Sequence, residues 1–263
     1  MKLGYFLAFY LLFLLFWSCT PTEKINVVRD RVDFGKDWLF QKGDTIKPAD
    51  WIPVSLPHTA NIEPLVVNYQ WQGISWYKKE FTVEKGKENK NHFIYFEGVM
   101  QEADVWLNGK KVTNHKGGYL PFTVDISNEI KTTGNNEILV RVDNQDNETI
   151  PPGKELKVLD FNLYGGIYRN TYLITTGDVY ITDAVHANEP NSGGILVHFK
   201  DVSESFAKGI VKSHVKNASE LEKHVHAVMT FSDNEGLEKV FKSKEIVIKP
   251  NASETIEQLV TIN

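Results

Sequence analysis

Short runs in which apolar and polar residues alternate follow one another along most of the chain. Gly, Asn and Pro recur between these runs roughly every ten residues. Alternation with a period of two predicts half-buried β-strands, and regular turn signals are typical of a β-sandwich or barrel. In the first part of the chain the runs are 74–83, 93–96, 103–107, 137–142 and 167–174.

A second series of runs begins near Asp178. Polar turn segments such as 233–236 and 250–251 separate them. Six short strands within about 85 residues predict an immunoglobulin-like sandwich, which normally has seven or more strands. We therefore expect residues 178–263 to form such a sandwich, incomplete at its C-terminus. The runs are 179–186, 195–199, 209–215, 224–231, 240–248 and 255–262.

The dipeptide Asn108-Gly109 lies between two of the predicted strands. Both residue types tolerate positive φ, which a two-residue type I′ turn requires. The sequence therefore predicts a tight hairpin at this position. The junction near 175–177 is also short, so we expect the two units to pack against each other.

Composition excludes some classes of protein. Aromatic residues make up 12% and charged residues 24% of the chain, as in a globular protein and not a disordered one. The formal net charge is −5, and no stretch forms a polybasic arm. Nucleic acid is therefore not expected as a partner.

The N-terminus has the pattern of an export signal. Lys2 precedes an apolar stretch, 3–17, which is shorter than the roughly 20 residues that span a bilayer. The segment 15–19 (LFWSC) resembles a bacterial lipobox, which makes 1–19 a lipoprotein signal and Cys19, the only cysteine, the lipidated residue. The alternatives are an uncleaved anchor or an ordinary signal peptide. We expect a membrane partner through the lipid anchor and a place in the cell envelope of a Gram-negative bacterium, facing the periplasm or on the outer membrane.

Motifs that carry chemistry are scarce. The sequence has no Gly-rich phosphate loop, no Cys/His cluster with metal spacing and no nucleophile elbow. His224 and His226 lie two apart on a predicted strand, and we interpret them as an exposed strand face. No cofactor and no metal ion is expected in this chain.

Seven segments between residues 56 and 169 have a recognisable pattern. Together they resemble the N-terminal part of glycoside hydrolase family 2, which includes β-galactosidases, β-glucuronidases and β-mannosidases. The likeness is greatest to β-galactosidase-type members from gut Bacteroidetes. The segments are 56–59 (LPHT), 73–79 (GISWYKK), 96–99 (FEGV), 103–110 (ADVWLNGK), 115–122 (HKGGYLPF), 135–144 (NNEILVRVDN) and 160–169 (DFNLYGGIYR).

The resemblance implies an architecture. Members of the family have a jelly-roll (galactose-binding-like) sugar-binding domain, here 20–177, an immunoglobulin-like domain, here 178–263, and then a (β/α)8 barrel. The barrel holds both catalytic glutamates of a retaining mechanism. The resemblance therefore assigns no catalytic residue to this chain, and Glu97 and Glu102 are not candidates.

Two residues are candidates for contact with substrate. In similar family members the aspartate of the 160–169 loop reaches the mouth of the barrel and accepts a hydrogen bond from a sugar hydroxyl, which points to Asp160. The alternative is an aspartate that caps a turn. Asn68 is a second candidate, because some members place a sugar-contacting asparagine just before the strand that begins near Gly73.

Other residues of the matched segments have structural interpretations. We expect Trp76, Tyr77, Trp106 and Phe122 to pack in the core or between sheets. Arg169 is expected to pair with a carboxylate or carbonyl at a domain interface.

Three functions are consistent with the sequence. The first is the non-catalytic N-terminal portion of a retaining β-glycosidase, β-galactosidase-like, whose oligosaccharide substrate is bound by the barrel. The second is a free-standing surface lipoprotein that binds glycans. The third is a structural or adhesive sandwich protein.

Overall fold

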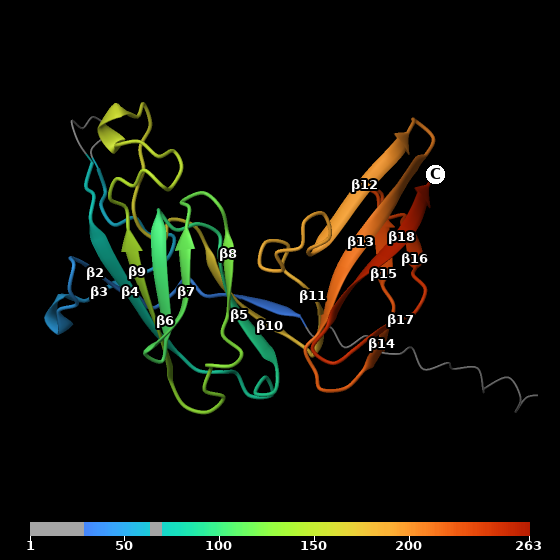
Figure 1. The fold of residues 1–263 in the computed structure, drawn as a ribbon, viewed down its shortest axis with the longest axis horizontal. Helices are drawn as coiled ribbons and strands as arrows, with labels where there is room; N and C mark the ends of the chain where they lie inside the picture. The colour runs from blue at the N-terminus through green and yellow to red at the C-terminus, as the bar shows by residue number, and fades with distance from the viewer. Residues whose placement is uncertain (1–28, 64–69) are drawn as a thin grey trace, which may run out of the picture.

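The computed structural model describes residues 29–63 and 70–263. Over these residues the chain is built almost entirely of β-strands, gathered in two units (Figure 1). The described segments contain two short 3₁₀ helices, η2 (Pro48–Asp50) and η3 (Leu156–Val158), and no α-helix. The all-β fold predicted from the sequence is confirmed.

The first unit consists of two antiparallel sheets. One sheet has the strand order β3-β2-β4-β9-β6-β7, and the other has the order β1-β10-β5-β8. The strands are β1 (Asp30–Asp33), β2 (Trp38–Lys42), β3 (Ile52–Val54), β4 (Ile74–Phe81), β5 (Asn91–Phe96), β6 (Glu102–Leu107), β7 (Lys110–Lys116), β8 (Phe122–Asp125), β9 (Asn136–Asp143) and β10 (Thr171–Thr176).

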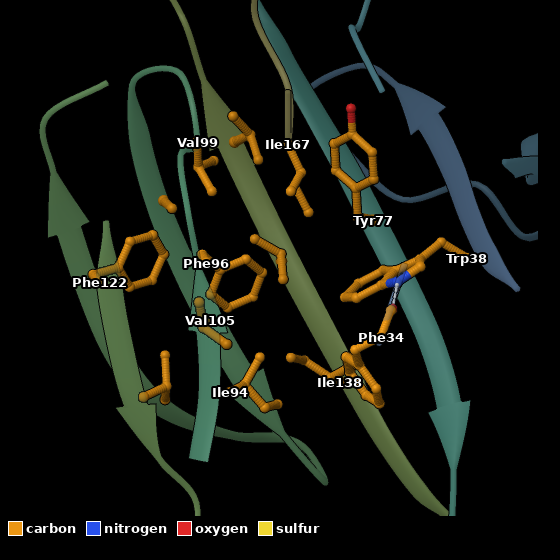
Figure 2. Close-up of a cluster of buried hydrophobic side chains, with 14 of the residues drawn as sticks. Phe34, Trp38, Tyr77, Ile94, Phe96, Val99, Val105, Phe122, Ile138 and Ile167 are labelled. Carbon is orange, nitrogen blue, oxygen red and sulfur yellow. Dashed lines mark hydrogen bonds between the residues drawn. The ribbon is translucent and has the colours of Figure 1, made fainter. Parts of the chain in front are cut away.

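The two sheets enclose one hydrophobic core (Figure 2). Strand β9 shows how the sequence builds it, because Ile138, Val140 and Val142 are buried while the residues between them are half-buried on the other face. Within the other sheet, the rings of Phe96 and Phe122, paired on the neighbouring strands β5 and β8, stack on the core side with centroids 4.9 Å apart. Each fully buried side chain of this size contributes about 1.5–3 kcal/mol to the free energy of unfolding.

The hairpin between β6 and β7 confirms the turn prediction. Asn108 has φ 51° and Gly109 has φ 83°, and Leu107 pairs with Lys110 across the turn. The Asn108 side chain also donates a hydrogen bond to the Glu129 carbonyl at 3.0 Å. The turn is therefore fixed by its backbone angles and by a contact to a neighbouring loop.

The second unit has a central strand, β13, with partners on both edges. Strand β18 pairs with it along one edge, and β12 and β11 share the other. The hairpin β15–β16 and the antiparallel pair β14–β17, which flanks it in the sequence, form the rest of the unit. The strands are β11 (Val179–Ile181), β12 (Ile195–Val202), β13 (Ala207–Asn217), β14 (Lys223–Val225), β15 (Val228–Ser232), β16 (Glu238–Lys242), β17 (Ile246–Ile248) and β18 (Ser253–Ile262).

The core of the second unit is sparse. Among the described residues its cluster contains three buried side chains, Val215, Ile248 and Ile256, against eighteen in the first unit. A hollow of about 710 Å³ lies beside them, lined by apolar residues that include Val197 and Phe231. The immunoglobulin-like assignment of this unit stays a prediction.

Several predicted strands are shorter or divided. The run 179–186 forms a strand only to Ile181, and the run 167–174 begins as a strand only at Thr171. The runs 224–231 and 240–248 are each split in two. Ser243 causes these breaks, because its hydroxyl accepts the Ala227 N–H at 2.9 Å and its own N–H donates to the Ala227 carbonyl.

The units meet where β10 ends at Thr176 and β11 begins at Val179. The Asn91 side chain donates to the Gly177 carbonyl at 2.8 Å, and Arg29 donates to the Ile181 carbonyl at 2.9 Å. The rings of Phe93 and Tyr180 lie 5.5 Å apart across the junction. The two units therefore contact each other, as the short junction predicted.

Candidate functional site

The candidate sugar-contacting residue Asp160 belongs to a loop at one end of the first unit. The connection between β9 and β10, residues 144–170, forms most of this end (Figure 1). Asp160 follows η3 in this loop, is exposed, and makes no side-chain hydrogen bond or ion pair with another described residue. Asn68 and Cys19 lie outside the described residues.

The surface around Asp160 combines aromatic and polar groups. Phe161 is 45% exposed and Tyr164 is 40% exposed. The Asn162 amide donates to the Tyr164 hydroxyl at 3.0 Å. A carboxylate with free oxygens beside exposed rings suits contact with a polyol, because the carboxylate accepts charge-assisted hydrogen bonds and the rings cover apolar sugar faces.

The far end of this loop is anchored by Gly165 and Gly166. Gly166 has φ 111°, and its backbone exchanges two hydrogen bonds with Met100, at 3.0 and 3.2 Å. A Cβ atom on Gly165 would lie 2.6 Å from the Asn144 amide nitrogen. The two glycines are therefore required where the loop passes close to its neighbours.

Asn144 joins the loop to the segment before β4. Its side-chain oxygen Oδ1 accepts the Gly73 N–H at 2.8 Å, and its side-chain amide donates to the Trp71 carbonyl at 3.1 Å. Next to it, Asp146 accepts the Gln72 amide at 2.7 Å and the Leu156 N–H at 2.8 Å. These bonds hold the loop carrying Asp160 to the neighbouring connection.

Glu63 has a structural role in the same region. It accepts hydrogen bonds from the Trp71 N–H at 2.9 Å and from the Asn61 amide at 2.6 Å. These bonds, the backbone one first, lower the pKa of the Glu63 carboxyl. The depression that these residues line with Leu163 and Tyr164 leaves no room for a water molecule. Glu63 is therefore engaged in holding the loop and is not the centre of a pocket.

Below the loops lies a neutral pair, His58 and Tyr77. The His58 Nδ1 atom and the Tyr77 hydroxyl are 2.9 Å apart. Burial raises the pKa of the Tyr77 hydroxyl, and burial followed by the nearby Lys42 charge lowers the pKa of His58. Both groups are uncharged at neutral pH and support the turn at 56–59.

The structure confirms the predicted places of some aromatic and histidine residues and contradicts others. Tyr77 and Phe122 are core residues, but the expectation is wrong for Trp76 and Trp106, which are half-buried on the outer face of their sheet with rings 5.9 Å apart. Their strand positions alternate with the buried ones, so the pleat directs them outward. His224 and His226 are exposed, as predicted.

Charged residues of the matched segments also have defined places. Arg169 is exposed and forms no ion pair or hydrogen bond with another described residue, so the predicted interface pair is not found there. Glu97 pairs with Arg31 at 3.1 Å, and Glu102 pairs with Lys116 at 3.6 Å. Both glutamates lie on the surface of the sandwich in ion pairs and do not face each other across a pocket.

Residues 29–63 and 70–263 contain no group of three or more His, Cys, Asp or Glu side chains arranged to hold a metal ion. Within the same residues, no helix has the length and apolar character needed to cross a membrane.

The sandwich and its loop end define a carbohydrate-associated β-sandwich module. The sequence profile of "Glycosyl hydrolases family 2, sugar binding domain" matches residues 37–177. The chain therefore belongs to glycoside hydrolase family 2 and carries the sugar-binding domain of that family.

Similar proteins support the assignment. A β-galactosidase of Thermoanaerobacter pseudethanolicus is 39% identical over 166 residues, which are 59% of this chain and 22% of that protein. A β-glucuronidase of Bacteroides fragilis is 29% identical over 252 residues, 94% of this chain and 34% of that protein. The solved structure of a β-glucuronidase from family 2 has a TM-score of 0.79 at 27% identity, covering 90% of this chain and 27% of that one. The chain thus spans between about a fifth and a third of these relatives, and no part of its described residues forms a (β/α)8 barrel.

The sequence motif points to Asp160 as a candidate but does not indicate the residues that hold its loop. Asn144 ends the matched segment 135–144, so its position in a motif was visible while its partners Trp71 and Gly73 were not. Glu63 carries no signal in the sequence, because its role depends on a contact with Trp71 eight residues away.

Proposed function

We propose that this chain is the N-terminal, non-catalytic portion of a retaining β-glycosidase that hydrolyses O-glycosyl bonds in galactosides. Two opposed carboxyl groups are needed for that reaction, held about 5–5.5 Å apart in retaining enzymes. The resemblance to family 2 places both in the barrel, and Glu97 and Glu102 of this chain are each held in an ion pair instead. The contribution of this chain is to support the catalytic barrel and to close one wall of its pocket with the 144–170 loop.

The observation that carries this proposal is that the Asp160 side chain is exposed and has no partner among the described residues. The carboxylate is exposed and unengaged by other described residues, while the loop on either side of it is fixed by Asn144 and Gly166. A free acceptor on a fixed loop is suited to a substrate hydroxyl and does not serve to cap a turn.

The test uses the full-length enzyme. Asp160→Ala is expected to lower kcat/KM for a nitrophenyl β-galactoside at least about tenfold, equivalent to about 1.4 kcal/mol of transition-state binding. Asp50→Ala is the matched control, because Asp50 is also exposed but lies in η2, well away from the 144–170 loop (Figure 1). An unchanged kcat/KM in Asp160→Ala would leave Asp160 as an ordinary surface residue.

The relatives carry both β-galactosidase and β-glucuronidase names. Assays with nitrophenyl β-galactoside and β-glucuronide in parallel decide between these substrates. A preference for the glucuronide would replace the galactoside in the proposal and leave the role of the loop unchanged.

We also propose a lipid anchor at Cys19 that holds the protein at the cell envelope. The apolar stretch 3–17 followed by Cys19 supports this placement. Cys19→Ser is expected to remove the protein from the membrane fraction and to abolish its labelling by radioactive palmitate. Retention in the membrane without label would indicate an uncleaved signal anchor instead.

A further inference from the structure

A crevice of about 490 Å³ lies between the two units. One wall is the outer face of the sheet that contains β5, β8 and β10, and the other is formed by β11 and the connection that follows it. In Figure 1, β5 and β8 face the second unit, and the connection between β11 and β12 lies between them. The volume falls in the range of about 300–1,000 Å³ that is typical of small-molecule sites.

The sheet contributes an outward-facing set of side chains. Phe93 pairs with Ile174 on one side and with Asp125 on the other, so the three form one row across the sheet. Thr123 and Thr176 lie on the same face, two residues from Asp125 and Ile174 respectively. The wall therefore combines apolar, hydroxyl and carboxylate groups.

Aromatic rings from both units meet at the crevice. The Phe93 ring lies 5.5 Å from Tyr180 at an interplanar angle of 61°, and 6.4 Å from His186. Burial, and then the Asp125 charge, raise the pKa of the Tyr180 hydroxyl to about 12, so it stays protonated and able to donate at neutral pH. Rings and hydroxyls of this kind match the apolar faces and hydroxyl edges of a sugar.

Two hydroxyl groups of the crevice have no partner. The Thr123 and Thr176 oxygens are buried and make no hydrogen bond with any described residue. Buried polar groups in native proteins are nearly always paired, so each of these hydroxyls would gain a partner if it were turned towards a ligand in the crevice. Rotation about χ1 redirects a threonine hydroxyl.

Two carboxylates of the crevice keep one free oxygen each. Asp183 Oδ1 accepts the N–H groups of Val185 and His186 at 3.0 and 2.8 Å, and Asp125 Oδ1 accepts the Ser127 N–H at 2.9 Å. The second oxygen of each carboxylate makes no hydrogen bond with a described residue. These oxygens are acceptors for hydroxyl donors.

The charge of the crevice disfavours an anion. Three carboxylates, from Asp125, Asp183 and Glu189, line it with two cations, Arg29 and Lys216. Arg29 donates to the Ile181 carbonyl and Lys216 to the Asn251 carbonyl, and the carboxylates outnumber the two cations by one. A ligand with hydroxyl groups and no negative charge fits this arrangement best.

We propose that the crevice between the units binds a short neutral saccharide. The site is separate from Asp160, because the 144–170 loop leads into β10 at Thr171 whereas the crevice lies at its other end, at Thr176. It is a non-catalytic binding site in addition to the barrel pocket proposed above.

The test measures binding to the purified 263-residue chain in mild detergent. Methyl β-galactoside and lactose are the neutral ligands, and methyl β-glucuronide is the anionic one; titration calorimetry gives the Kd. We expect millimolar Kd values for the neutral ligands, at least about fivefold tighter than for the glucuronide, because the carboxylates repel an anion. Absence of binding, or a preference for the glucuronide, overturns the proposal.

Conservative variants locate the site. Asp183→Asn keeps the Oδ1 acceptor of the turn but removes the charge, and is expected to weaken binding about fivefold or more. Asp233→Asn is the matched control, since Asp233 Oδ1 accepts the Glu235 and Leu237 N–H groups in the distant β15–β16 turn. Its Kd is expected to stay within about twofold of the parent value.

Thr176→Val is an independent test of where the saccharide binds. It removes a buried hydroxyl that lacks a partner, so it is expected to weaken saccharide binding while raising the Tm of the free protein. Binding that survives both Asp183→Asn and Thr176→Val but is lost in Asp160→Ala would move the site to the 144–170 loop and overturn the proposal. The role of Asp160 in catalysis is tested separately by the kinetics of the full-length enzyme.

Discussion

A Cβ atom added to Gly166 would overlap the hydroxyl oxygen of Tyr77. Tyr77 is fully buried, and its ring is held by contact with Phe40 at 5.0 Å and by the bond to His58. The hydroxyl therefore has little freedom to move aside. This relationship fixes the path of the loop as it leaves the candidate site.

Gly166→Ala is predicted to destabilise the protein by about 2–4 kcal/mol, since a positive φ and a steric overlap both oppose the new methyl group. Gly134→Ala is the matched control, because Gly134 has φ 81° and open space around its Cα. It is expected to cost about 1 kcal/mol. Urea unfolding of the two variants measures the difference, and equal losses would contradict the overlap.

Asn144→Leu is predicted to loosen the candidate site. The change leaves the Gly73 N–H and the Trp71 carbonyl without their partner in a buried position, which costs about 2–4 kcal/mol for the two groups. Hydrogen exchange within residues 144–165 is expected to become faster. Asn114→Leu serves as the control, because the Asn114 amide is exposed and bonds only to surface carboxylates. Unchanged exchange in Asn144→Leu would mean that other contacts hold the loop.

The fold class and the tight turns could be predicted from the sequence because they depend on neighbours along the chain. Alternation in β9 and the Asn108-Gly109 turn are local signals, and the structure has both. The end of β11 was missed although its signal is also local. Asp183 accepts two backbone N–H groups in an Asx turn, which stops the strand after Ile181.

The parts of the site that could not be predicted depend on contacts between distant segments. Asn144 bonds to Trp71, 73 positions earlier, and the crevice joins Phe93 to Tyr180. Neither contact can be recognised from the periodicity or the composition of the sequence. Asp160 is a candidate only because a family motif surrounds it, since an exposed aspartate in a loop has no signal of its own.

The two units are expected to differ in stability against local opening, because their hydrophobic cores differ in size. The first unit buries a large contiguous cluster, whereas the hydrophobic cluster of the second unit contains three buried residues beside a hollow of about 710 Å³. Amides of β15 and β16 are therefore expected to exchange with solvent at least about tenfold faster than those of β9, because local opening there exposes less apolar surface. Mass spectrometry of exchange on the isolated chain measures both. Equal protection would show that the units unfold as one.

One buried and two half-buried histidines predict a pH dependence. Burial is the main cause that lowers the pKa of His58, His92 and His115, all in the first unit. A lowered folded-state pKa means that the unfolded chain binds protons first as the pH falls. The stability of the first unit is thus fully present above pH 6.5, the ordinary value for histidine, and decreases as the pH drops through the folded-state values.

His92→Gln isolates one of these contributions. His92 is 1% exposed, bonds to the Lys87 carbonyl at 3.0 Å, and lies near the Lys87 charge, which further opposes its protonation. Glutamine keeps a donor for that carbonyl but cannot take up a proton. The loss of unfolding free energy between pH 7.5 and 5.5, measured in urea, is expected to be smaller in His92→Gln than in the parent. His198→Gln, at an exposed position of β12, is expected to leave the loss unchanged. If His92→Gln shows the full loss, proton uptake by this histidine does not drive the acid sensitivity.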